Sequence, residues 1–281
     1  MLCHIPHILS KDSDWIIFLH GLGGNSNIYY KQVEDYKQHF NLMFIDLFGH
    51  GCTLEQLNEY TFETLAKSAV NVMDEEGITS AHIVGVSLGT IVMDAFSMLA
   101  PERIKTMILS GAVQGYDFRT RFLLKTGALL QNIMPYMWLY KLFAFIMMPR
   151  KNHSASRQIF VREAKKLGGE EFRKWYTLME SLEPFYASLP ASAENSIPRL
   201  YISGDEDHLF LPFVMASYFK DPLASIHIIE KCGHVCNIEC PEEFNRVSLT
   251  YLKSFPDLPK LEHIPEHSKA RQLAVNFNNK N

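Results

Sequence analysis

The sequence predicts an α/β protein with a mostly parallel sheet, helices on both faces of the sheet and one helical insertion. Short apolar segments of strand length recur along the chain, and longer segments with helical spacing separate them. Continuous apolar strands that alternate with helices are typical of parallel sheets buried on both faces. Residues 113–196 break this alternation and show no clear strand. We therefore predict a core domain of residues 1–112 and 197–256, a helical cap of residues 113–196 and a C-terminal tail of residues 257–281.

Six apolar segments are the predicted strands. They are Trp15–Leu19, Leu42–Ile45, Ile83–Val84, Met107–Leu109, Leu200–Ile202 and Ile226–Ile229. Apolar side chains at helical spacing predict helices over Phe62–Glu76 and Pro241–Phe255. Thr61 or Thr64 can provide the N-cap of the first of these helices. Beyond Pro256 the chain turns polar, which predicts a frayed tail.

The predicted cap is rich in methionine and aromatic side chains, which suit an adaptable apolar pocket. Met134, Trp138 and Phe143 are candidates to contact a substrate, although packing within the cap explains the same composition. Within residues 129–148, polar residues interrupt the apolar run, which stays shorter than the ~18 residues of a membrane span. We predict no transmembrane helix. A cap helix packed on the core is preferred, and an amphipathic helix lying on a bilayer is the alternative, so peripheral membrane contact stays open.

Composition narrows the class of protein further. The 281 residues are 47% hydrophobic and carry a formal net charge of −4, so a large core is expected and nucleic acid is not an expected partner. The first residues show no signal-peptide pattern. Five cysteines, an odd number, then favour reduced thiols in a cytoplasmic protein. The sequence gives no indication of the oligomeric state.

The pentapeptide Gly85–Gly89 reads G-x-S-x-G, with Ser87 at its centre. An apolar strand segment precedes it and the helix-compatible segment Thr90–Ala100 follows. This context of strand, sharp turn and helix is the one that a nucleophilic serine requires. The glycines leave room where strand and helix cross, and the helix N-terminus favours negative charge at the site. The alternative is an ordinary glycine-flanked turn between a strand and a helix.

A nucleophilic serine also needs donors for the oxyanion that forms on attack. The segment His20–Gly24, which reads HGLGG, directly follows the first predicted strand and can turn a backbone N–H into the site. The N–H of Leu88 would be a second donor. A phosphate-binding loop is the alternative, but the sequence lacks both the P-loop pattern and the dinucleotide-binding pattern. We therefore predict no cofactor.

The serine needs a base, and the base needs an acid that orients it. The segment Gly204–Asp207 follows the Leu200–Ser203 strand and offers three carboxylates, of which one is the preferred acid. A solvated turn or a cation site would use the same carboxylates. His234, after Gly233 and the last predicted strand, is the candidate base. The chain order Ser, Asp, His fits a triad of this type.

Three cysteines lie at a spacing of four around this histidine. Cys232, Cys236 and Cys240 invite a zinc interpretation together with His234. Gly233 favours a loop here, however, and no second ligand cluster is present, so buried reduced thiols are preferred and no metal is predicted.

Taken together, these motifs resemble those of the α/β-hydrolase superfamily over about residues 12 to 256. The segments that carry the resemblance are His20–Leu22, Asp46–Gly51 (DLFGHG), Gly85–Gly89, Pro101–Ile104, Gly204–Asp207 and Gly233–His234. The resemblance implies the α/β-hydrolase fold. A serine nucleophile argues against the haloalkane dehalogenase and epoxide hydrolase relatives, which use an aspartate there. The short N-terminus departs from the family and suggests that the usual first strands are incomplete.

The resemblance also implies roles for individual residues. Ser87 would be the nucleophile, His234 the base, and the backbone N–H groups of Leu22 and Leu88 the oxyanion hole. The acid in similar sequences is the third residue after the glycine, here Asp207. The following proline, Pro212, comes one position later than usual, which keeps Asp205 as the alternative acid.

The predicted function is therefore that of a serine esterase acting through an acyl-enzyme on lipophilic acyl esters. Thioesterase, lactonase, carbon–carbon hydrolase and perhydrolase chemistries use the same residues and stay open. A ligand-binding protein with a vestigial triad is an alternative from a different class, and a membrane-surface interaction protein is another.

Overall fold

An eight-stranded sheet forms the centre of the computed structural model, which describes residues 2–130, 133–189 and 197–278. Its strands are β1 (His4–His7), β2 (Trp15–Leu19), β3 (Asn41–Ile45), β4 (Ala81–Val86), β5 (Ile104–Ser110), β6 (Arg199–Gly204), β7 (Ala224–Ile229) and β8 (Glu262–His263). Their order in the sheet is β1-β3-β2-β4-β5-β6-β7-β8. Only β1 pairs antiparallel with its neighbour, and the other described pairs are parallel.

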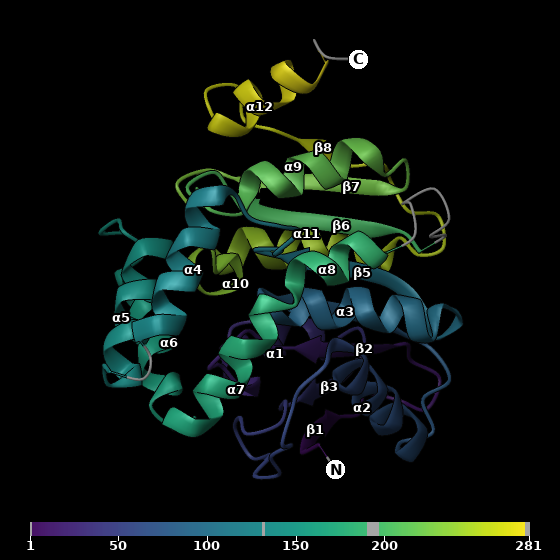
Figure 1. The fold of residues 1–281 in the computed structure, drawn as a ribbon. Helices are drawn as coiled ribbons and strands as arrows, with labels where there is room; N and C mark the ends of the chain where they lie inside the picture. The colour runs from purple at the N-terminus through teal and green to yellow at the C-terminus, as the bar shows by residue number, and fades with distance from the viewer. Residues whose placement is uncertain (1, 131–132, 190–196, 279–281) are drawn as a thin grey trace.

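Helices cover both faces of this sheet. In the core they are α1 (Val33–Tyr36), α2 (Phe62–Glu75), α3 (Leu88–Leu99), α9 (Leu211–Lys220), α10 (Cys236–Glu239) and α11 (Pro241–Lys253). Figure 1 shows α2, α3 and α9 on one side of the sheet and α1 and α11 on the other. The side chains of β3, β4, β6 and β7 are buried throughout, as expected for strands covered on both sides. The predicted α/β-hydrolase fold class is confirmed, and all six predicted strands are present.

The register of the sheet brings four loops to one edge. Leu19 at the end of β2 lies opposite Gly85 of β4, Gly85 lies opposite Leu109 of β5, and Gly204 of β6 lies opposite Ile229 of β7. Because parallel strands share a direction, the segments that follow β2, β4, β6 and β7 all leave from this edge. The motifs found in the sequence occupy these segments, so the register brings them together.

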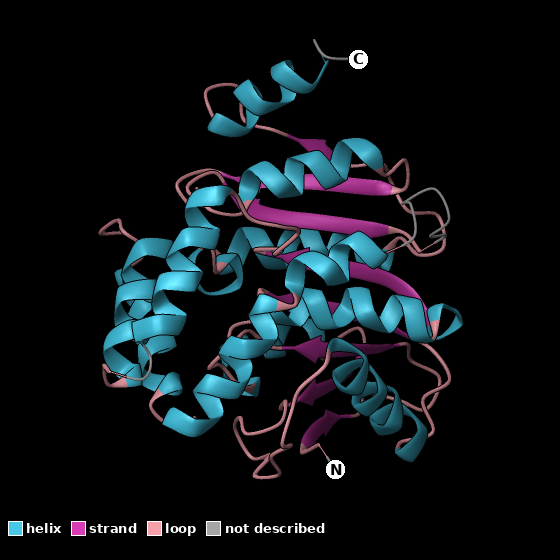
Figure 2. Cartoon of the chain, in the orientation of Figure 1, coloured by secondary structure: helices cyan, strands magenta, loops and turns pink. Residues whose placement is uncertain are grey.

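Five helices lie between β5 and β6 in the described residues of that segment. They are α4 (Phe118–Leu130), α5 (Tyr136–Met147), α6 (Ser154–Ala164), α7 (Gly169–Glu180) and α8 (Leu182–Ser188), and we call them the inserted helices. Helices α4 to α7 gather at one end of the sheet, and no strand interrupts them in the described part of the segment (Figure 2). None of the described helices is long and apolar enough to cross a membrane.

The C-terminal segment is more ordered than the predicted frayed tail. Beyond Pro256 the chain adds β8 to the edge of the sheet and then forms α12 (Lys269–Asn278), seen beyond β8 in Figure 1. Ala270 and Ala274 are buried one turn apart, and their small side chains allow α12 to pack closely on α9. The prediction was wrong because two alanines in a polar segment give little apolar periodicity.

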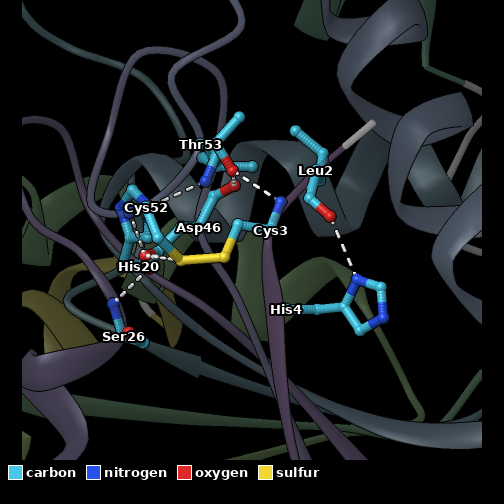
Figure 3. The surroundings of a disulfide bond; sticks show 9 residues. Leu2, Cys3, His4, His20, Ser26, Asp46, Cys52 and Thr53 are labelled. Carbon is cyan, nitrogen blue, oxygen red and sulfur yellow. Dashed lines mark hydrogen bonds between the residues drawn. A yellow bond between two sulfur atoms is a disulfide. The ribbon is translucent and has the colours of Figure 1, made fainter.

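Two of the five cysteines form a disulfide, which corrects the prediction of reduced thiols. Cys3, at the start of the chain, is bonded to Cys52 in the loop after β3, and their Cα atoms lie 5.6 Å apart (Figure 3). The antiparallel pairing of β1 with β3 brings the two residues together. Asp46, the first residue of the DLFGHG loop, accepts a hydrogen bond from the backbone N–H of Cys52 at 2.8 Å. This bond connects the disulfide to that loop.

Candidate active site

Ser87 lies at a strained turn between β4 and α3. Its φ of 53° and ψ of −116° are rare for a residue with a side chain and are typical of a nucleophilic serine on a tight turn. A methyl group at Gly89 would overlap the carbonyl oxygen of Leu19, and one at Gly85 would lie only 2.9 Å from the backbone carbonyl carbon of Gly89. Both glycines of the pentapeptide are therefore required where β2, β4 and α3 cross.

His234 connects Ser87 to Asp207. Its Nε2 lies 2.9 Å from Ser87 Oγ, and its Nδ1 lies 2.7 Å from Asp207 Oδ2. Because a carboxylate accepts only, Nδ1 carries the proton in this arrangement and Nε2 of the neutral ring is free to accept the serine proton. The side chains of His234 and Asp207 are 0% and 1% exposed, so water competes little for either bond. A methyl group at Gly111 would meet the backbone of His234, so the loop after β5 also fixes this ring.

The alternative acid, Asp205, does not contact His234. Its carboxyl group lies near the backbone N–H groups of Lys231 and Cys232, and its pKa is raised by partial burial and by the neighbouring Glu206 carboxylate. Of the two sequence candidates, the structure places Asp207 on the histidine.

The HGLGG loop is held beside Ser87 by its own backbone. A methyl group at Gly21 would lie 3.2 Å from the Cβ of Ser87, so loop and serine are in close contact. The carbonyl of Gly21 accepts hydrogen bonds from Gly24 N–H at 2.9 Å and from His20 Nδ1 at 2.8 Å. In a trans peptide the N–H points opposite to the carbonyl, so these two bonds fix the direction of the Leu22 N–H.

The second predicted donor, the N–H of Leu88, begins helix α3. The first N–H groups of a helix have no intrahelical acceptor, and the helix dipole favours negative charge there. Leu22, Ser87 and Leu88 all line the same cavity. The structure thus brings together every residue predicted for the triad and the oxyanion hole except Asp205, and their catalytic roles remain predictions.

Two further contacts hold the peptide between Leu22 and Gly23. Its N–H donates to His50 Nε2 at 2.9 Å, and its carbonyl accepts from the Tyr140 hydroxyl at 2.7 Å. His50 can accept only as a neutral ring, and burial together with the adjacent His20 holds the pKa of His50 well below its usual value. Tyr140 comes from α5, and sequence reasoning missed it because one of several cap tyrosines carries no local signal.

Buried carboxylates connect the inserted helices to the loops that carry the triad. His153, just before α6, is buried, and its Nε2 lies 2.7 Å from Glu206 and 3.7 Å from Glu239. Glu206 directly precedes Asp207, and Glu239 accepts the N–H of Gly233 at 2.7 Å. These contacts hold the acid loop and the histidine loop in place from the same side.

An apolar cavity of about 140 Å³ opens at Ser87, and the inserted helices form most of its wall. Its lining includes Leu22, Leu88, Leu123, Leu124, Leu130, Leu139, Phe143, Ile146, Met147, Phe160, Phe172 and Phe210. No charged side chain and no histidine is among the described lining residues. A long apolar group bound to the serine would therefore find a matching surface, whereas a charged group would not.

One of the three suspected cap residues lines this cavity. Phe143 does so, whereas Trp138 is 67% exposed and neither it nor Met134 is among the described lining residues. The suspicion about Trp138 was wrong because the sequence does not tell which face of α5 the core covers.

The potential metal ligands do not line the cavity at Ser87. Cys232, Cys236 and Cys240 are free thiols, and burial contributes to a raised pKa of the Cys236 thiol. One group of three donors within the described residues could hold a metal ion: His227 of β7, Glu243 of α11 and His263 of β8, whose ligand atoms lie within 4.8 Å of one another. None of these three residues lines the cavity at Ser87.

Comparison with known proteins agrees with this fold. The family model described as "alpha/beta hydrolase fold" matches residues 14–131. A solved structure, the enol-lactonase from Burkholderia xenovorans LB400, superposes with a TM-score of 0.75 at 18% identity and covers 90% of this chain and 96% of that chain. Over residues 14–131 the chain matches the α/β-hydrolase family, and its fold throughout the described residues is the α/β-hydrolase fold.

Two curated proteins illustrate the range of similar sequences. A 2-hydroxy-6-oxononadienedioate/2-hydroxy-6-oxononatrienedioate hydrolase from Burkholderia vietnamiensis is 28% identical over 207 residues, which is 67% of each chain. A putative carbamate hydrolase, RutD, from Azorhizobium caulinodans is 22% identical over 248 residues, covering 84% of this chain and 90% of that one. The family match and these relatives support a hydrolase.

Proposed function

We propose that this hydrolase cleaves carboxylic esters of lipophilic acyl groups through an acyl-enzyme on Ser87. The observation that carries the proposal is the position of His234, 2.9 Å from the serine hydroxyl and 2.7 Å from Asp207, beside an apolar cavity. The chemistry follows from the serine and its partners, and the substrate class follows from the cavity.

The reaction begins when His234 Nε2 takes the proton of Ser87 and the serine oxygen attacks the ester carbonyl. The N–H groups of Leu22 and Leu88 stabilise the oxyanion, and Asp207 stabilises the imidazolium. His234 then gives the proton to the leaving alkoxide, and the acyl group remains on the serine. A water molecule, deprotonated by the same histidine, releases the acid and restores the enzyme.

The cavities on the two sides of Ser87 differ in volume, which supports a proposal for where the acyl and alcohol parts of the ester lie. The leaving alcohol must lie on the side of His234, because that ring protonates it. A cavity of only about 20 Å³ lies on this side, lined by His234, Ile28, Ser156 and Phe160 among others. The cavity of about 140 Å³ is then left for the acyl chain. We therefore propose a long acyl group and a small alcohol.

The residues that line the cavity also favour an uncharged ester over the dioate substrate named for one relative. A dioate carries carboxylates, and a buried carboxylate needs a cationic or hydrogen-bonding partner. The cavity offers no Lys, Arg or His among its described lining residues, and two of its three tyrosine hydroxyls, those of Tyr140 and Tyr176, donate to backbone carbonyls. This favours an uncharged acyl chain over a dicarboxylate.

The test is reaction with a fluorophosphonate probe followed by mass spectrometry of the labelled peptide. We expect label on Ser87, none in Ser87→Ala and little in His234→Ala. Methyl esters of increasing acyl length, assayed next, should show kcat/KM rising with chain length. Label without ester turnover would leave a serine hydrolase of another substrate class, and absence of label on folded protein would contradict the proposal altogether.

A further inference from the structure

Helices α4 and α5 are apolar on two opposite faces. Their inner faces contribute Leu123, Leu124, Leu139 and Phe143 to the cavity at Ser87. Large apolar side chains also extend outward from these helices and the segment between them, with 49% to 81% of each exposed. They are Phe118, Phe122, Leu129, Ile133, Trp138, Leu142 and Phe145, and of these Leu142 also lines the cavity. We call these seven residues the outer apolar face.

This concentration is unusual for a surface in water. The outer apolar face holds seven of the sixteen exposed large apolar side chains that the structure describes, within 28 residues of the chain. A large exposed apolar patch on a protein surface normally marks contact with another protein or with lipid. Figure 1 places α4 and α5 at one end of the molecule, and the seven side chains of the outer apolar face are exposed there. The described helices are also too short to span a bilayer, so lying on its surface is the lipid contact open to them.

The charges around this face identify the partner. Residues 118–162 contain eight Lys and Arg residues and no Asp or Glu, although the whole chain is net acidic. An open groove of about 340 Å³ between α5 and α6 is bordered by four cationic side chains, Lys141, Arg157, Arg162 and Lys165, of which Arg162 forms an ion pair with Glu163. Exposed apolar side chains next to a cationic groove complement a bilayer with anionic headgroups.

We infer that the outer apolar face docks on a membrane containing anionic phospholipid, with a lipid phosphate held in the groove of Lys141 and Lys165. Phe145 belongs to the outer apolar face and also lines the groove, so insertion of the apolar side chains and binding of the phosphate take place at one surface. Docking in this way brings the lipid next to the two helices whose inner faces line the cavity. The inference does not depend on which ester the serine cleaves.

The experiment is co-sedimentation of full-length Ser87→Ala protein, which cannot turn over lipid, with vesicles of phosphatidylcholine alone or mixed with phosphatidylserine. We expect binding to the mixed vesicles, little to the neutral ones, and weakening at high salt because screening shortens the range of the attraction. Removing the charges in Lys141→Gln/Lys165→Gln should weaken binding about thirtyfold, at about fivefold per charge. The matched control is Lys11→Gln/Lys67→Gln, two exposed lysines outside the inserted helices, which should bind as the parent does.

Trp138 provides a direct readout of insertion. It is 67% exposed, so its emission should shift to shorter wavelength on the mixed vesicles, and Trp138→Phe should lose the shift while still binding. Phe122→Glu/Phe145→Glu should lose binding, whereas Ile8→Glu, at an exposed residue after β1, should keep it. Circular dichroism and fluorophosphonate labelling of the same substitutions with Ser87 restored would show that each is folded.

Three outcomes would overturn the inference. The first is equal binding to neutral and anionic vesicles, and the second is binding unaffected by the substitutions in the groove and the face. The third is concentration-dependent self-association in sedimentation velocity that the Phe122→Glu/Phe145→Glu substitutions abolish, without vesicle binding by the parent, since a second copy of the chain would then be the partner.

Discussion

The hydroxyl of Tyr140 donates a hydrogen bond of 2.7 Å to the carbonyl oxygen of Leu22. An inserted helix thereby holds the loop that provides one of the two proposed oxyanion donors. Tyr140 is buried, and burial raises the pKa of its hydroxyl well above its ordinary value, so the hydroxyl keeps its proton at any pH of interest.

Tyr140→Phe should therefore lower kcat and leave KM for a short ester nearly unchanged, because the loop shifts while the acyl cavity stays. Loss of an oxyanion donor itself costs roughly a hundredfold or more in kcat, and loss of an anchor should cost less. Steady-state kinetics measures the split. Tyr176→Phe is the matched control, since that hydroxyl bonds to Leu124 within the inserted helices, and an equal loss in both variants would contradict the role of Tyr140.

Substitution of the two candidate acids should affect kcat to very different extents. Asp207→Asn should lower kcat by roughly ten-thousandfold, because the amide no longer holds the histidine in its productive tautomer. Asp205→Asn should stay within about threefold of the parent, because Asp205 contacts backbone N–H groups and not His234. Initial rates on a methyl ester compare the two. A large loss in the second variant alone would reverse the assignment.

Filling the cavity should change acyl preference. Leu123 lines the cavity from the inner side of α4, whereas Leu129 of the same helix is 75% exposed. Leu123→Trp should lower kcat/KM for long acyl chains by roughly tenfold or more and leave acetyl esters little changed, since over-packing affects only the distal part of the substrate. Leu129→Trp should leave the whole profile unchanged. A uniform loss for all chain lengths in Leu123→Trp would indicate that the acyl chain does not enter this cavity.

Stability should depend on pH through His82. This histidine is buried in β4, and burial lowers its pKa from 6.5 to about 4. Between pH 6.5 and about 4, His82 is therefore protonated in the unfolded chain but not in the folded chain. Unfolding free energy should be greatest above pH 6.5 and should fall across this window, by up to about 1.4 kcal/mol per pH unit for one such group. Urea unfolding at several pH values measures the slope, which should be smaller in His82→Gln. An identical slope in parent and variant would place the pH dependence elsewhere.

The disulfide between Cys3 and Cys52 closes a loop with a sequence separation of 49 residues. Reduction should lower the unfolding free energy by roughly 2–4 kcal/mol, because the cross-link restricts the unfolded chain. Urea unfolding with and without dithiothreitol measures this effect, and Cys52→Ser should abolish it. Cys240→Ser, which removes a free thiol, should keep it. Insensitivity of the parent to dithiothreitol would mean that the two thiols are not bonded in solution.

The features that the sequence predicted correctly are those whose structural requirements lie within a short segment of the chain. The turn at Ser87 was predictable because its steric requirements lie within Gly85–Gly89 and the segments beside it. Buried strands such as β2 and β7 were predictable for a similar reason, since a parallel strand covered on both faces is a continuous apolar run. Position in the chain was enough to single out His234 among 12 histidines.

Long-range pairing was not predictable in the same way. Cys3 and Cys52 meet only because β1, an exposed edge strand without an apolar run, pairs with β3. The choice between Asp205 and Asp207 required the path of the loop after β6. The outward direction of Trp138 required the packing of α5, because a helix that is apolar on both faces gives no indication of which face the core covers.

The wall of the cavity comes mostly from one continuous stretch of the chain, residues 118–182, whereas Ser87, Asp207 and His234 lie outside that stretch. Mutation can therefore change substrate selectivity without changing the residues that carry out the catalytic chemistry. Mutations, or exchange of the whole stretch between relatives, can alter which acyl group is accepted while the bond-breaking apparatus persists unaltered. Lineages that share this layout are free to diversify in the substrates they hydrolyse, with Tyr140 and His153 among the positions where a newly acquired stretch must still fit the old scaffold.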